Sequence, residues 1–312
     1  MNALYSSDAD ESDKSLLNYV PDAALILNIG TDHYSRAELA EVFLTFAKSA
    51  RSCVIMELAA FREIGPEYFP AGKMILLFSG DPDAPVSCGG RRVLRLDSYR
   101  VADGSAWCAF KGLPEIRLPM PGRHNALNAL AVHTVLTSRG YDSMDALKAV
   151  SEFSGVARRF DRAGLMSNGA QVIDDYAHNV EKLASCIGAA QELAPEGRVV
   201  TVFQPHGFAP LRFMREALTN ALPSILRPAD EFIFLPVYYA GGTASFSPTS
   251  AEVAESCRNV PGLNDGAVRY FDDRMECESY LKTAVKRGDV VIVAGARDES
   301  LSIWAKSLTK YA

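Results

Sequence analysis

The sequence has no apolar run of the roughly 18 to 20 residues that a membrane-spanning helix requires. Its first residues also lack the basic region followed by an apolar one that marks a secretory signal. We therefore predict a cytoplasmic protein with no membrane partner.

The chain has no excess of positive charge either. Its 32 Lys and Arg residues are outnumbered by 38 Asp and Glu residues, so the formal net charge is −6. Nucleic-acid binding depends on basic groups that neutralise phosphates, and this balance argues against a nucleic-acid partner.

Closely spaced cysteine pairs are absent. The six cysteines are scattered and include no CxxC pair, which argues against a structural zinc site and against a dense disulfide framework. We expect them to be buried free thiols.

The chain does have the length and the apolar content for two domains. Its 312 residues are about twice a common domain size. Hydrophobic residues make up 48% of the sequence and charged residues 22%, which excludes disordered, collagen-like and coiled-coil proteins.

The first half predicts a partial α/β domain. A strand at 23–29, a helix at 36–50 and a strand at 53–58 form a βαβ pattern, and a helix follows at 122–139. Turn signals between 74 and 118 predict antiparallel hairpins added to this sheet. No βαβ unit precedes the first strand, and we expect that sequence is missing upstream.

The second half predicts a complete doubly wound domain, because short β-branched runs alternate with helical segments. The predicted strands are 171–175, 198–203, 231–237, 268–271 and 289–294. The predicted helices are 181–193, 211–222, 250–257, 275–285 and 301–308.

Candidate ligands for a cation lie near the first strand. An acidic segment contains Asp8, and the strand leads into a segment that contains Asp32 and His33. In open α/β sheets ligands bind beyond the carboxyl ends of strands, where a carboxylate and an imidazole can hold a cation. The alternative is a solvated acidic tail with Asp32 as a helix cap.

Two further segments carry groups suited to a nucleotide. Asn125 and Asn128 are three residues apart near the start of a predicted helix, so they share a face and can contact a base edge. Arg158 and Arg159 lie at the predicted domain junction, where a guanidinium can pair with phosphate oxygens. The alternatives are amides that cap a helix and arginines that are merely solvated.

Polar groups after two strands of the second half are the strongest candidates. Asp175, Tyr176 and His178 end or follow a predicted buried strand, where a role in the core would require a buried partner for each. His206 has the equivalent place after the next strand. We predict that the groups of the first segment are functional, whereas the segment with His206, taken singly, reads as a loop.

Taken together, these segments resemble the Mur ligase family, and within it the branch that contains UDP-N-acetylmuramate:L-alanine ligases and muropeptide ligases. The resemblance runs from about Asp8 to the C-terminus, and the order and spacing of the motifs make it specific. The motifs are DADESD at 8–13, NIGTDH at 28–33, GRHNALNAL at 122–130, RRFD at 158–161, DDYAHN at 174–179, FQPH at 203–206 and GDVVIVAGARD at 288–298.

The resemblance implies a fold and a reaction. The implied fold is α/β, with a truncated central P-loop-type ATPase domain at 1–152 and a Rossmann-like doubly wound C-terminal domain at 153–312. In this family ATP phosphorylates a carboxylate, and an amine attacks the acyl phosphate through a tetrahedral intermediate. The implied cofactors are ATP and Mg²⁺, and the implied substrates are UDP-N-acetylmuramate and an amino acid or peptide.

The resemblance also implies roles for residues of the first half. Asp8 and His33 fall where the family holds magnesium, and His33 is accordingly counted among the catalytic residues. Asn125 and Asn128 fall on the amides that contact adenine in the family.

In the second half, Arg159 and Asp175 match residues that the C-terminal domain contributes to the nucleotide. Arg159 is also a predicted catalytic residue. His178 and His206 are the remaining predicted catalytic residues, and the resemblance places them nearer the acceptor amino acid.

The sequence departs from the family at several positions. Asp8 stands where the family usually has Glu, and a shorter carboxylate can require a bridging water. Gly207 and Pro210 stand in a stretch where the alanine-adding branch carries arginines, with Arg212 or Arg215 as the possible substitutes. The identity of the acceptor is therefore open.

The family's phosphate-binding loop and its N-terminal domain would both precede Asp8. We therefore predict the C-terminal two-thirds of an ATP-dependent ligase that is inactive, or nearly so, as an isolated chain. The alternative is a non-catalytic homologue that serves as a binding module or as half of a split enzyme completed by a separate chain. A dinucleotide-dependent oxidoreductase is disfavoured because no GxGxxG follows a predicted strand.

Overall fold

The computed structural model describes residues 14–30, 35–239, 241 and 245–309. The chain divides into two compact units, and each is described by itself. Unit 1 comprises Met1–Leu118 and Arg123–Phe153, and unit 2 comprises Pro119–Gly122 and Ser154–Ala312.

Unit 1 is built on one sheet with the strand order β1-β2-β3-β5-β6-β7, and β4 pairs with β5. The pairs from β1 to β5 along this order are parallel, whereas β5, β6 and β7 are antiparallel. The strands are β1 (Ala23–Ile26), β2 (Cys53–Glu57), β3 (Met74–Ser79), β4 (Ser87–Cys88), β5 (Arg91–Ala102), β6 (Ser105–Phe110) and β7 (Ile116–Leu118).

The prediction that 74–118 forms antiparallel hairpins was wrong for β3. This strand pairs in parallel with both β2 and β5, and only the later strands form hairpins. The long β5 serves both arrangements, since its first part pairs with β3 and its register with β6 shifts between Leu96 and Ser98. Such an irregularity bends a strand, which lets one strand belong to both parts of the sheet.

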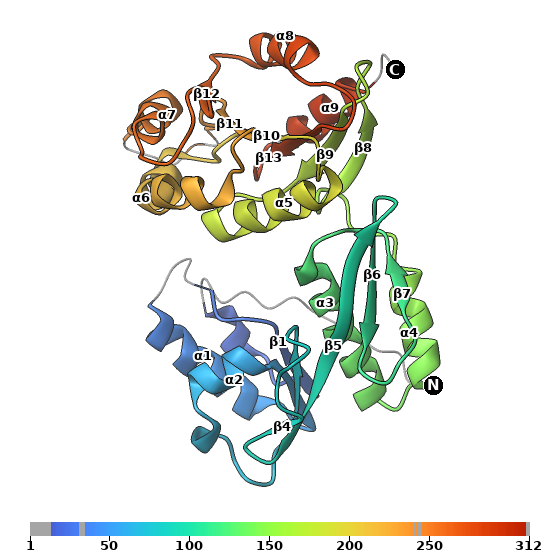
Figure 1. Ribbon diagram of the computed structural model, residues 1–312. Coiled ribbons are helices and arrows are strands. Elements are labelled where there is room, and N and C mark those ends of the chain that lie inside the picture. Colours follow the sequence, from blue (N-terminus) through green and yellow to red (C-terminus); the bar gives the residue numbers. More distant parts are fainter. Residues whose placement is uncertain (1–13, 31–34, 240, 242–244, 310–312) are drawn as a thin grey trace. The chain divides into compact units, whose positions relative to one another are not determined.

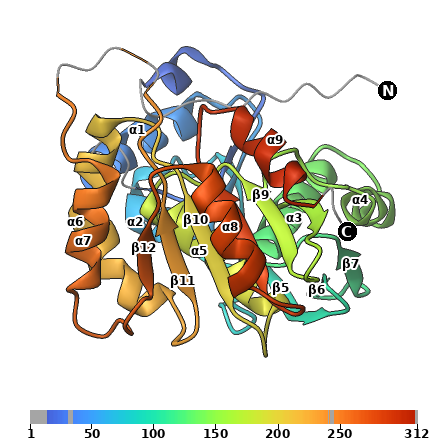
Figure 2. The ribbon, with the colours of Figure 1, turned by 90° about the horizontal axis from the view of Figure 1, so that it is seen from above.

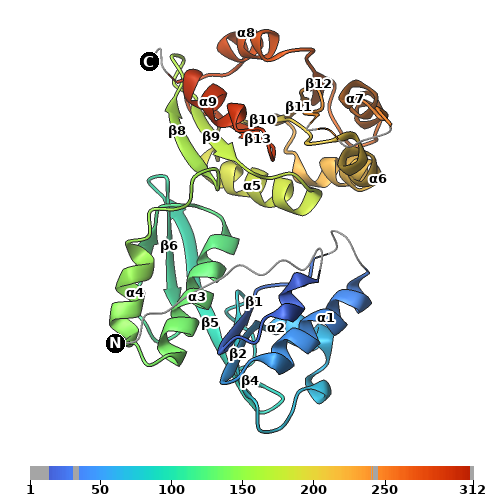
Figure 3. The same ribbon diagram turned by 180° about the vertical axis from the view of Figure 1, so that it is seen from behind.

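Helices cover both faces of the unit 1 sheet (Figure 3). α1 (Arg36–Ser49) and α2 (Leu58–Ile64) bury Leu39 and Phe61 against one face, while α3 (Arg123–Ser138) and α4 (Ser143–Ser151) bury Leu130 and Leu147 against the other. Two short 3₁₀ helices, Ser15–Asn18 and Pro66–Tyr68, complete the described part of the unit.

Unit 2 contains a six-stranded sheet with the order β12-β11-β10-β13-β9-β8, seen from above in Figure 2. Only the edge strand β8 is antiparallel to its neighbour. The strands are β8 (Asp161–Leu165), β9 (Gln171–Asp175), β10 (Val199–Phe203), β11 (Glu231–Phe234), β12 (Val268–Tyr270) and β13 (Val290–Ala294).

Side chains alternate along these strands and form two separate cores, each beneath helices on one face of the sheet. The helices on the two faces are labelled in Figure 1. One core joins a sheet face to α5 (Val180–Leu193), α6 (Phe208–Ile225) and α7 (Ser250–Arg258). The other joins the opposite face to α8 (Arg274–Ala284) and α9 (Ser300–Ser307). Because the strands are buried on both faces, they read as nearly continuous apolar runs. The predicted doubly wound domain is confirmed.

The six cysteines are free thiols, as predicted, and all except the half-buried Cys88 are buried. Among the described helices, none is long and apolar enough to cross a membrane.

Candidate active site

The carboxyl ends of β9, β13 and β10 lie next to one another in unit 2. Asp175, Ala294 and Phe203 are in register across these three strands. The neighbouring strands β10 and β13 lead into α6 and α9, which cover opposite faces of the sheet. Connections that diverge in this way leave a crevice at the strand ends, where ligands of open α/β sheets bind.

Two imidazoles meet at this edge. The rings of His178 and His206 are edge to face, with their centroids 5.1 Å apart. The Nδ1 of His178 lies 2.9 Å from the carbonyl oxygen of Tyr176 and donates to it, since a carbonyl can only accept. Its other ring nitrogen, Nε2, lies 3.4 Å from Lys182 Nζ. The structure thus brings the two predicted histidines together.

The surroundings of His206 keep its ring neutral. Burial lowers its pKa to about 4, and the nearby cationic groups of His178, Arg297 and Lys182 act in the same direction. At neutral pH the ring therefore has one N–H donor and one acceptor nitrogen.

Both arginines of the RRFD motif make cation–π contacts with the aromatic ring of Tyr176. The Cζ atom of Arg158 lies 4.9 Å from the ring centroid, and that of Arg159 lies 5.5 Å from it. The half-buried Arg158 donates from Nη2 to Gly295 O at 2.6 Å, and its Nε lies 3.5 Å from an oxygen of the buried Asp174.

Arg159 differs from its neighbour because its side chain is exposed. Among the described residues its guanidinium has no hydrogen-bond or ion-pair partner, so the guanidinium N–H groups remain available to a ligand. The prediction that Arg159 pairs with phosphate therefore rests on a guanidinium that is held by a ring contact and has its donors free.

Three residues of this edge have left-handed backbone conformations, which side chains with a Cβ rarely adopt. The φ angles are 59° at Arg158, 51° at Phe160 and 65° at Arg297. Phe160 is buried in the core beneath the site, and the N–H of Arg297 donates to the hydroxyl of Tyr176 at 3.2 Å. Strained backbone of this kind concentrates at functional sites.

The Asp175 carboxylate stabilises the left-handed turn that contains Arg158 and Phe160. One of its carboxylate oxygens accepts from Phe160 N and the other from Ala177 N, both at 2.7 Å. Burial raises the pKa of the Asp175 carboxyl, although the two N–H donors and Arg159 act in the opposite direction. Asp174 is likewise partnered, by Arg158 and by the hydroxyl of Ser302. Both carboxylates therefore have buried partners, which the sequence pattern did not indicate.

A second polar network was missed from the sequence. Arg274 donates to Gln204 Oε1 at 2.6 Å and to Asp298 Oδ2 at 2.5 Å, and Gln204 Nε2 donates to the same carboxylate oxygen at 3.1 Å. Burial acts to raise the pKa of Asp298, but hydrogen bonds from Ser300 and the charge of Arg274 hold it below its ordinary value. Gln204 and Asp298 lie in quoted motifs and were assigned no role, whereas Arg274 lies in none.

This network borders a pocket of about 300 Å³ that also includes the segment from Leu235 to Tyr239. Tyr238 N donates to Pro205 O at 2.8 Å, so the pocket adjoins the loop that carries His206. The pocket extends the carboxyl edge beyond the residues predicted from the sequence.

The candidates in unit 1 are only partly described. Asn125 is half-buried and Asn128 is exposed, both in the first half of α3. The predicted metal ligands Asp8 and His33 lie outside the described residues. Within the part of the chain that the structure describes, no group of three or more His, Cys, Asp or Glu is placed to hold a metal ion.

Comparison with known proteins connects this geometry to a family. Residues 158–297, which carry the carboxyl-edge loops from Arg158 to Arg297, match the Mur ligase, glutamate ligase domain. A UDP-N-acetylmuramate–L-alanine ligase of Kineococcus radiotolerans is 32% identical over 94% of this chain. The chain is therefore a relative of the Mur ligases, and its residues 158–297 form their glutamate ligase domain.

Solved Mur ligase structures have the same fold. The UDP-N-acetylmuramate–alanine ligase of Thermotoga maritima matches 96% of this chain with a TM-score of 0.68 and 23% identity. The MurF ligase of the same organism, in complex with ADP, matches 96% with a TM-score of 0.68 and 20% identity. The chain spans about three fifths of the length of the curated relatives, at 61% of the Kineococcus protein.

Arg212 and Arg215 were the possible substitutes for the arginines of the alanine-adding branch. Both guanidinium groups hydrogen-bond to other residues of unit 2. Arg212 donates to Ser245 Oγ and Ser247 O, and Arg215 donates to Ser256 Oγ at 2.6 Å. Both side chains therefore tie α6 to neighbouring segments.

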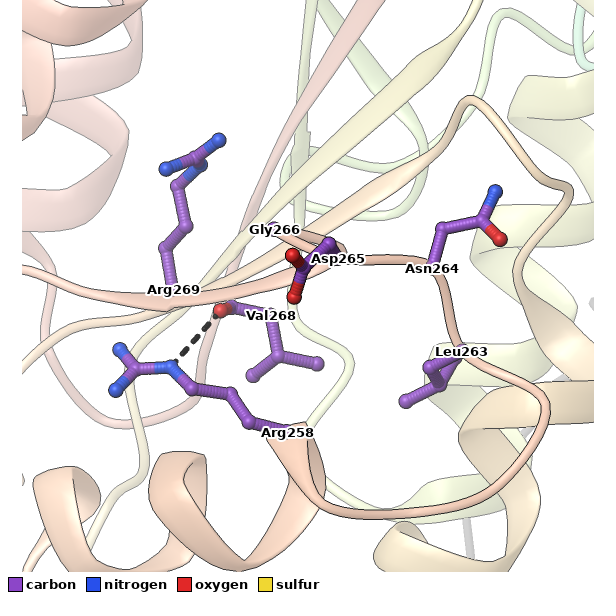
Figure 4. Close-up of a pocket in the computed structure, with 7 residues that line it drawn as sticks. All are labelled: Arg258, Leu263, Asn264, Asp265, Gly266, Val268 and Arg269. Atoms are coloured by element: carbon purple, nitrogen blue, oxygen red, sulfur yellow. Dashed lines mark hydrogen bonds between the residues drawn. The ribbon is translucent and has the colours of Figure 1, made fainter.

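A further hollow of about 230 Å³ lies at the opposite end of this Mur ligase domain (Figure 4). It is formed where the chain enters β12 at its amino end. Its two guanidinium groups are engaged, since Arg258 donates to Val268 O at 3.1 Å and Arg269 pairs with Glu231 at 2.9 Å. This hollow is not part of the carboxyl-edge site.

Proposed function

We propose that the chain is the ATP-using and acceptor-binding part of a ligase that joins an amino acid or peptide to the carboxylate of UDP-N-acetylmuramate. The observation that carries the proposal is the cluster of His178, His206, Arg159 and Tyr176 at adjoining strand ends of a Mur ligase domain. The names of the relatives support the substrates, and the ADP complex of a structural neighbour supports the nucleotide.

The reaction would proceed in two balanced steps. A carboxylate oxygen of UDP-N-acetylmuramate attacks the γ-phosphorus of ATP, and ADP leaves. The amine nitrogen then attacks the acyl carbon, a tetrahedral intermediate forms, inorganic phosphate leaves and the amine loses a proton. Because charge builds on the transferred phosphoryl group, catalysis depends mainly on positioning and on compensating positive charge.

In this scheme Arg159 supplies charge-assisted hydrogen bonds to phosphate oxygens, because its donors are free and its stem is held over Tyr176. Asp175 acts as a positioning residue, since both of its oxygens hold the turn that presents Arg159. We therefore propose that Asp175 contributes to nucleotide binding indirectly, by positioning Arg159.

The histidine pair would orient the acceptor. His206 is neutral at pH 7, so its acceptor nitrogen can take a hydrogen bond from the acceptor's amino group without charge repulsion. The Nε2 of His178 lies 3.4 Å from Lys182 Nζ, and its ring is edge to face with that of His206. The adjoining pocket near Tyr238 would accommodate part of the acceptor.

Mg²⁺ is the further cofactor that the family resemblance implies. The side chains proposed to hold it, Asp8 and His33, are outside the described residues, and the described residues offer no such cluster. The steps above are accordingly assigned to the chain's own side chains.

The test uses the chain in frame with any coding sequence that precedes it in its genome. Product is measured by mass spectrometry and phosphate release, with ATP, UDP-N-acetylmuramate and a panel of amino acids and short peptides. The proposal predicts release that requires all three substrates. A folded protein that binds the substrates and forms no product with any acceptor would instead support the non-catalytic alternative.

A further inference from the structure

Unit 1 contains a pocket that is lined by none of the residues assigned a role above. It lies between β5, the turn after β6 and the second half of α3, and its volume is about 540 Å³. Pockets that bind small molecules commonly have volumes of about 300 to 1,000 Å³. The size of this pocket therefore suits a small organic ligand.

The walls of the pocket are mainly apolar. Phe110 and Leu130 contribute to it and belong to the buried core between the sheet and α3, and Val93 adds a buried aliphatic wall from β5. Leu113 and Val86 lie at the same pocket, and Val86 is 66% exposed. An apolar group bound here would cover side chains that are otherwise open to water.

The charged groups of the pocket are all cationic. Arg92, Arg95 and Lys111 line it, and the described residues that line it include no Asp or Glu. The Arg92 guanidinium has no hydrogen-bond or ion-pair partner among the described residues, although the backbone of Arg92 pairs with Ser87. Lys111 pairs at 2.8 Å with the exposed Asp97, a type of surface contact that contributes little and that a ligand can replace. The electrostatic balance favours an anionic ligand.

A buried histidine supplies a further polar atom. The His133 side chain is 3% exposed, and its Nε2 lies 3.2 Å from Ser143 O and 3.1 Å from Ser143 Oγ. Its Nδ1 is buried and has no hydrogen-bond partner within the described chain. Because His133 lines the pocket, its imidazole signals report on a ligand that binds there.

We propose that this pocket binds a small organic anion, in which an apolar body about the size of one ring carries a carboxylate or a phosphate group. The apolar body covers Leu113 and Val86, and the anionic group meets Arg92 and Lys111. The site is separate from the carboxyl edge of unit 2 and does not depend on the proposed ligase function.

The test is isothermal titration calorimetry of the whole chain with phenyl phosphate and with benzoate. Both should bind saturably at a single site, and the tighter of the two identifies the preferred anionic group. Benzyl alcohol lacks the charge and inorganic phosphate lacks the apolar body, so each should bind at least about tenfold more weakly. Absence of saturable binding by both anions at millimolar concentration would overturn the proposal.

Two arginines of β5 provide a matched pair of variants. Arg92→Ala should weaken binding about tenfold, whereas Arg100→Ala should leave it unchanged, because Arg100 pairs with Glu115 outside the pocket. In the NMR spectrum, phenyl phosphate should shift the imidazole signals of His133, assigned with His133→Gln. Equal losses in the two variants, or shifts confined to His178 and His206, would overturn the proposal.

Discussion

At the level of single residues, Arg158 and Arg159 are chain neighbours with different surroundings. Arg158 is half-buried against Asp174, whereas Arg159 is exposed above Tyr176. Removing Arg158 leaves a buried carboxylate without its cation, so Arg158→Ala should lower the free energy of unfolding by about 3 kcal/mol. Arg159→Ala should change it by less than about 0.5 kcal/mol. Urea unfolding measures both, and equal losses would contradict the assignment of separate roles.

His206 gives a prediction about pH. The folded chain binds a proton at His206 with a pKa of about 4, compared with 6.5 for an ordinary histidine. Between these values the unfolded chain holds more protons, so the free energy of unfolding falls as the pH is lowered from 6.5 toward 4. His206→Gln should flatten this fall, because it removes the group whose proton binding differs between the folded and the unfolded chain. Parallel pH profiles for the wild type and His206→Gln would refute the pKa assignment.

The residues of the site were only partly predictable from the sequence. Polar groups that follow buried strands signal a ligand edge, and this pattern located His178 and His206. Arg159 was located by its place at the predicted domain junction. They did not reveal that Asp175 is bonded to backbone N–H groups, since those donors come from a turn whose geometry depends on left-handed residues. Arg274 reaches the site from the start of α8, and no local pattern marks such a distant contribution.

At the level of elements, the capping box of α7 makes a testable contribution. The Thr249 hydroxyl accepts from Glu252 N, and the Glu252 carboxylate accepts from Thr249 N at 2.7 Å. Loss of such a cap leaves helical N–H groups unsatisfied, so Thr249→Ala should lower the free energy of unfolding by about 1 kcal/mol. Thr283→Ala is the control, because Thr283 is an exposed residue of α8 whose hydroxyl donates to Tyr280 O at 3.0 Å. A loss no greater than that of the control would show that the cap is dispensable.

The elements of unit 2 were predicted better than those of unit 1. Parallel strands buried on both faces produce strong apolar runs, and five of them were located. The edge strand β8 was missed because its polar sequence, interrupted by Gly164, resembles a loop. The short α2 was missed because it begins directly after β2, where Glu57 accepts from Ala59 N and Ala60 N.

At the level of the whole molecule, the central claim is that the carboxyl-edge loops of unit 2 form the reactive site of a Mur ligase. Arg159 tests this claim most cleanly, since its exposed side chain contributes little to folding and its donors are free for phosphate. Arg287 is a matched control, because it is also exposed but precedes β13 at the opposite end of the sheet.

The decisive measurement is the rate of ATP-dependent product formation from UDP-N-acetylmuramate and the best acceptor. The account predicts that Arg159→Ala lowers this rate about tenfold or more, with an unchanged free energy of unfolding, while Arg287→Ala retains the wild-type rate. A wild-type rate for Arg159→Ala would contradict the claim that this edge binds the reacting phosphate.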